Sequence, residues 1–66
     1  MSSVGEEILV ELKRNRELLE TYKEIGPAGA FGHMMISADI DAAEKALAES
    51  DVIAIIQSYE KLKGNK

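Results

Sequence analysis

The chain has 66 residues, a formal net charge of −4 and no cysteine. This length allows one domain at most, and the lack of cysteine excludes disulfides and thiolate metal sites. The acidic balance argues against direct binding to nucleic acid and against binding to anionic membranes, because both need basic residues. A core of this size supplies about 3–5 kcal/mol at best, so we expect tightly packed helices or association with a partner chain.

Residues 6–25 are predicted to form the first helix. Its apolar positions recur every three or four residues, on a line formed by Ile8, Leu12, Leu19 and Tyr22 with the polar Asn15 between them. Acidic residues at the start of this segment suit the positive end of a helix dipole. Gly26 and Pro27 end the helix, because proline lacks a backbone donor and restricts the residue before it.

Residues 26–32 contain three glycines, and the sequence leaves open whether this segment is loop or helix. A phosphate-binding loop is one interpretation, but no Lys-Ser or Lys-Thr pair follows the last glycine and no strand precedes the first. We favour a turn in which glycine permits close backbone packing. A further alternative is that Ala28, Gly29 and Gly32 allow a helix of a second chain to approach closely.

Residues 30–49 are predicted to form the second helix and residues 51–63 the third. The second helix has two adjacent apolar lines, which are Ile36, Ile40, Ala43 and Leu47, and Met35, Ala38, Ala42 and Ala46. The β-branched residues at 52–56 are also compatible with a strand, but the apolar series continues at helical spacing and no second strand is available for pairing.

Three amphipathic helices on short connections predict an all-α fold, either a three-helix bundle or a helical hairpin with antiparallel neighbours. Residues 1–66 are expected to form a single helical domain in which residues 1–5 and 64–66 are frayed. No basic region followed by an apolar one precedes the first helix, so we expect a cytoplasmic protein without a signal peptide.

Few residues are candidates for chemistry. His33 is the only histidine, and no carboxylate lies one helical turn away from it to orient it as a base. The acidic residues Asp39, Asp41 and Glu44 are more typical of a solvated helix face than of a cation site. An enzyme or metal protein based on His33 and these carboxylates ranks last, and we expect no catalytic, cofactor-binding or metal-binding residue and no enzyme activity.

One stretch resembles a segment shared by small uncharacterised proteins encoded in bacteriophages and prophages. The resemblance rests on residues 22–32, which include the motif Glu-Ile-Gly-Pro-Ala-Gly-Ala-Phe-Gly, and continues at Met35, Ile36, Asp39, Ile40 and Tyr59 and through residues 62–64. It covers most of the chain but contains no catalytic residue. It implies a phage-derived protein that acts in the cytoplasm of a bacterial host.

The wide apolar faces and the small core predict a self-associating protein–protein interaction module, most simply a two-fold homodimer. The phage resemblance implies that this module acts on a host or phage protein. Asn15 within an apolar line is typical of a helical interface whose register it fixes. The alternative function is an acidic modulator that occupies the nucleic-acid-binding site of a host protein. The residues expected at the interface are Leu12, Asn15, Leu19, Tyr22, Phe31, Met34 and Met35.

Overall fold

The computed structural model describes residues 3–66, which form three α-helices and a short 3₁₀-helix and contain no strand. The elements are α1 (Val4–Ile25), η1 (Gly26–Gly29), α2 (Ala30–Ala48) and α3 (Val52–Gly64). This arrangement confirms the all-α prediction, and the helix ends differ from the predicted ones by one or two residues. Residues 1 and 2, which belong to the segment expected to be frayed, lie outside the described residues.

Helix α1 begins two residues earlier than predicted because Ser3 caps it. The Ser3 Oγ accepts a hydrogen bond of 3.2 Å from the backbone N–H of Glu6, one of the donors that a helix start leaves without a partner. Val4 and Gly5 are therefore helical. The helix ends at Gly26, whose φ of 80° lies in the region that favours glycine.

The segment from Gly26 to Gly29 is a 3₁₀ turn that leads directly into α2. Close packing requires glycine at Gly29 and at Gly32 in the first turn of α2, whereas a Cβ at Gly26 would meet nothing within 4 Å. A Cβ at Gly29 would lie 2.3 Å from the backbone oxygen of Tyr22, and one at Gly32 would lie 2.7 Å from the Tyr22 ring. These glycines therefore allow α2 to approach α1 of the same chain. The alternative that they receive a helix of a second chain is wrong, because Tyr22 already occupies the space beside them.

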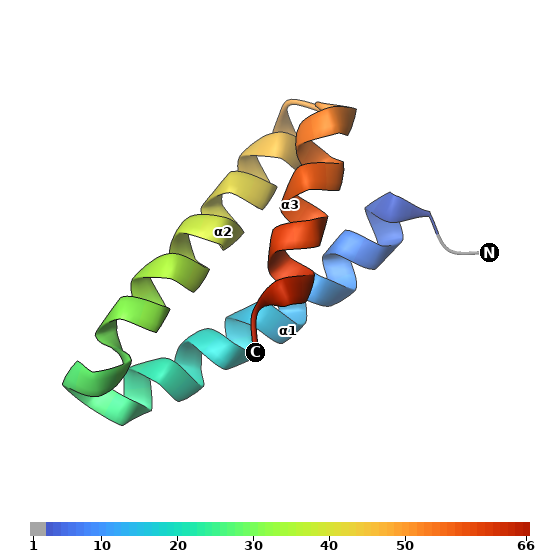
Figure 1. Cartoon of the computed structure of the whole chain (residues 1–66). Coiled ribbons are helices and arrows are strands. Elements are labelled where there is room, and N and C mark those ends of the chain that lie inside the picture. Colours follow the sequence, from blue (N-terminus) through green and yellow to red (C-terminus); the bar gives the residue numbers. More distant parts are fainter. Residues whose placement is uncertain (1–2) are drawn as a thin grey trace.

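Helices α2 and α3 run antiparallel, and α1 crosses them at an angle (Figure 1). Ser50, with a φ of 53°, reverses the chain after α2, and the Asp51 side chain caps α3 by accepting a bond of 3.1 Å from the N–H of Ala54. Each helix contacts both of the others, which makes the fold a three-helix bundle rather than a two-helix hairpin.

All three helices contribute to one small core. Its buried members are Ile8 and Leu12 from α1, Ile36, Ile40 and Ala43 from α2, and Leu62 from α3. The partly buried side chains packed against this core are Leu18, Leu19, Tyr22, Leu47, Ile55 and Tyr59. The line of apolar residues predicted for α1 is therefore the side of α1 that builds the core of the monomer.

Candidate functional site

The seven residues expected at an interface divide into two groups. Leu12 and Asn15 are 2% and 0% exposed, and Leu19 and Tyr22 are half-buried against the core. A residue buried within one chain has no surface left for a second chain. Leu12 and Asn15 therefore belong to the interior of the chain, and Asn15 does not lie in a seam between two copies, whereas Leu19 and Tyr22 keep part of their surface exposed.

Asn15 instead joins α1 to the end of α3. Its Nδ2 donates hydrogen bonds of 2.7 Å to the backbone oxygen of Glu11 and 3.1 Å to that of Leu62. Its Oδ1 accepts a bond of 2.9 Å from the side-chain amide of Asn65, which also donates to Asp39 of α2 at 3.1 Å. The buried amide is thus satisfied by partners on α1, on α3 and at Asn65, as a polar group in a core must be, and Asn65 extends the network to α2.

Arg14 reinforces the same junction. Its guanidinium donates bonds of 2.7 Å to the backbone oxygen of Leu62, which also accepts the N–H of Asn65, and 2.8 Å to the backbone oxygen of Asn65, the residue that follows α3. It also forms a salt bridge of 3.0 Å with Glu11 one turn earlier. The hydrogen bond from Arg14 to Glu11 raises the pKa of the guanidinium above its usual value, so this group keeps its charge.

The residues that follow α3 are held against α1, contrary to the expectation that residues 64–66 are frayed. Gly64 is the last helical residue, Asn65 takes part in the network around Asn15, and the backbone oxygen of Lys66 accepts a bond of 2.7 Å from the Tyr22 hydroxyl. Sequence reasoning missed these contacts because the paired residues are 44–51 positions apart. An asparagine placed within an apolar line was the one available sign of a buried polar contact.

The other three expected residues do lie on the surface. Phe31, Met34 and Met35 are 71%, 58% and 47% exposed on the first turns of α2. Ala38 and Ala42, one and two turns further on, are exposed beside them. Because positions three, four and seven apart share one side of a helix, these residues form a continuous apolar strip, which we call the outer face of α2.

Exposed apolar side chains also occur elsewhere on the described residues. Those on α3 are Val52, Ile53 and Ile56, and those on α1 are Val4, Leu9, Val10 and Ile25. Within residues 3–66, ten large apolar side chains are exposed, whereas seven hydrophobic residues form the buried core. Large apolar areas on a folded chain usually mark a surface that contacts another molecule.

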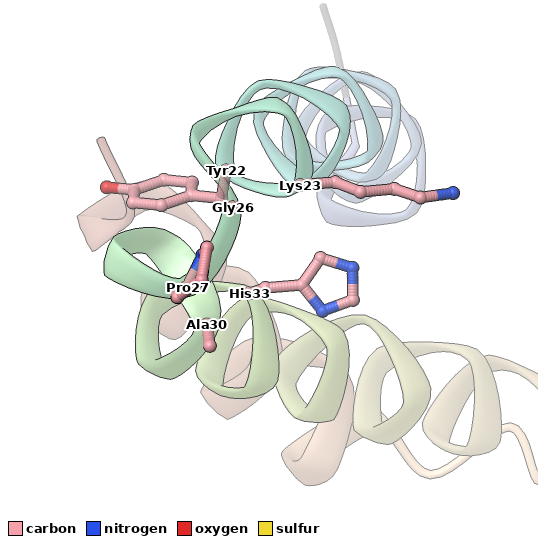
Figure 2. Close-up of a pocket in the computed structure, with 6 residues that line it drawn as sticks. All are labelled: Tyr22, Lys23, Gly26, Pro27, Ala30 and His33. Carbon is pink, nitrogen blue, oxygen red and sulfur yellow. The ribbon is translucent and has the colours of Figure 1, made fainter.

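His33 lies one turn into α2 and lines an open pocket of about 390 Å³ at the corner between α1 and α2. Its imidazole and the Lys23 side chain extend in the same direction, while the Tyr22 ring lies on the other side (Figure 2). The rest of the lining is Gly26, Pro27 and Ala30, so no carboxylate joins His33 in this pocket. The pocket therefore does not gather the partners that a histidine base requires.

The acidic side chains of α2 do not gather into one site. Asp39 accepts a bond from Asn65, and Glu44 forms a salt bridge of 3.2 Å with Arg16 of α1, while Asp41 is exposed. In the part of the chain that the structure describes, no group of three or more histidine, aspartate or glutamate side chains is placed to hold a metal ion.

Comparison of the chain with protein-family models, with curated proteins and with solved structures finds no match. Among residues 3–66, no helix has both the length and the apolar character needed to cross a membrane.

Proposed function

We propose that this chain is a self-associating protein–protein interaction module, and that the outer face of α2 is the surface through which it associates. The observation that carries this proposal is the exposure of Phe31, Met34 and Met35 side by side on one helix. Methionine and phenylalanine are enriched at protein interfaces, where flexible or large apolar groups fill the partner's surface. The expected product is a two-fold homodimer, because one patch then covers its own copy.

The apolar surface favours this function over an acidic modulator of a nucleic-acid-binding site. A mimic of nucleic acid needs closely spaced charges on one face, but the outer face of α2 carries apolar side chains over three turns. A cytoplasmic location, an origin in a phage or prophage, and action on a further host or phage protein remain parts of the proposal. Their support is the sequence resemblance, which implies a phage-derived protein that acts in the cytoplasm of a bacterial host.

Sedimentation equilibrium over roughly 1–500 μM tests the proposal, since one helix face buries less area than a standard interface and binds weakly. We expect a dimer mass that falls to the monomer mass in Met35→Glu, which places a charge on the outer face. Val10→Glu is the matched control, because Val10 is 64% exposed on α1 and away from this face. A wild-type chain that remains monomeric throughout this range contradicts the proposal.

A further inference from the structure

The residues on the outer face of α2 are regularly spaced, and their spacing indicates how a second helix packs on this face. Phe31, Ala38 and Lys45 are spaced seven residues apart, so they lie almost on one line along the helix. Ala38 is roughly half a turn around the helix from the buried Ile36 and Ile40, and the line is therefore opposite the side that contacts α1 and α3. A second helix can approach along this line without displacing either neighbour.

The sizes of the side chains change along this line. The first half of the face carries Phe31, Met34 and Met35, and the second half carries Ala38 and Ala42. If two copies paired in parallel, the bulky halves would meet each other and the small halves would leave a gap, which wastes packing contacts. An antiparallel pair places the bulky half of each copy on the small half of the other, and the face then complements itself.

The register of such a pair follows from the same positions. With the two-fold axis at Ala38, Met34 lies beside Ala42 of the second copy and Phe31 lies beside Lys45 of the second copy. Within residues 3–66, Lys45 has no ion-pair partner, and an ammonium group over a phenylalanine ring gains a cation–π contact. The alanine at the axis lets the two backbones approach closely.

We infer that the occupant of the outer face is a second copy of this chain, paired through antiparallel α2 helices with the two-fold axis at Ala38. This inference rests on the proposed function and specifies the geometry of the homodimer. It makes the dimer specific, because a partner helix without the same gradient from large to small side chains fits the face less well.

Cysteine cross-linking tests the register, since the natural chain contains no cysteine. Helix axes packed about 9–10 Å apart place directly facing Cα atoms about 4–5 Å apart, within the range that a disulfide spans. Ala38→Cys is therefore expected to form a covalent dimer under mild oxidation. The two positions 31 of such a pair are about 21 Å apart, so Phe31→Cys alone is expected to remain uncross-linked.

A mixture of Phe31→Cys with Lys45→Cys is expected to form the mixed disulfide, as read on a non-reducing gel. Val10→Cys, exposed on α1, reports the background from random collisions. Cross-linking of Phe31→Cys to itself above background, whether or not Ala38→Cys also cross-links, indicates parallel pairing and overturns the inference. If neither variant cross-links above background while the wild-type chain sediments as a dimer, the inference fails and the proposed function stands. A monomeric wild-type chain removes both.

Discussion

Ile36 and Ile40 lie on the inner side of α2 and are buried with residues of α1 and α3, whereas Phe31 and Met35 lie on other sides of the same helix and remain exposed. Both sides are apolar, so hydrophobicity alone does not decide which one enters the core. The inner side is distinguished by its glycines, because Gly29 and Gly32 share it and permit α1 to come close. At its start, α2 thus turns its glycines toward α1, and the isoleucines that follow on the same side are buried.

The largest effect is expected from shortening a side chain on the inner side. Ile40→Ala removes buried atoms from the core and leaves a cavity, so we expect the free energy of unfolding to fall by about 2–5 kcal/mol. Met35→Ala is the matched control on the outer face and is expected to change the free energy of unfolding by about 0.5 kcal/mol or less. Urea denaturation followed by circular dichroism, at a concentration where the chain is monomeric, measures both. Equal losses in the two variants would show that the outer face is also part of the folded core.

The next largest effect is expected at Gly29, where α2 approaches α1 closely. Gly29→Ala places a Cβ against the backbone oxygen of Tyr22, which cannot move without shifting α1, and we expect a loss of about 1–3 kcal/mol. Gly5→Ala is the control, because Gly5 is helical and a Cβ there meets its first neighbour at 3.7 Å. This control is expected to be neutral or slightly stabilising. Thermal unfolding of the two variants under identical conditions measures the difference, and an unchanged Gly29→Ala variant would contradict the close packing of α1 and α2.

The smallest of these effects is expected at the polar position in the core. Asn15→Leu removes three hydrogen bonds. Two of the former partners keep another bond, because the Leu62 oxygen still accepts from Arg14 and the Asn65 amide still donates to Asp39. We therefore expect a loss of about 1 kcal/mol, the value of one typical hydrogen bond, and an unchanged mass in sedimentation. If Asn15→Leu altered the association state while leaving stability intact, Asn15 would belong to an interface after all.

Much of the fold was predictable from the sequence because helical spacing and stop residues are local. The pattern of Ile8, Leu12 and Leu19 and the break at Pro27 each depend on a few neighbouring positions. Those patterns fixed the existence, type and approximate ends of all three helices. Spacing also showed correctly that a helix, not a strand, follows Asp51.

The candidate site was predictable only in part. Spacing identifies which residues share a side of a helix but not which side meets another helix of the same chain, so Leu12 and Asn15 were assigned to an interface although they lie in the core. Phe31 and Met35 were also assigned to the interface, and these two side chains are exposed. Their exposure could have been anticipated, because Gly29 and Gly32 mark the opposite side of α2 as the side that packs against α1. The contacts of Asn65 had no local pattern at all.

The contact between α1 and the end of α3 also governs how the chain opens. The hydrogen bonds from Arg14 and Asn15 to residues 62–65 join positions 47–51 apart in sequence, so nearly the whole chain must be closed before they form. A last helical turn tied in this way cannot melt by itself, unlike a free helix end. Unfolding of α3 is thereby coupled to the loss of α1, and a chain with so small a core behaves as one cooperative unit.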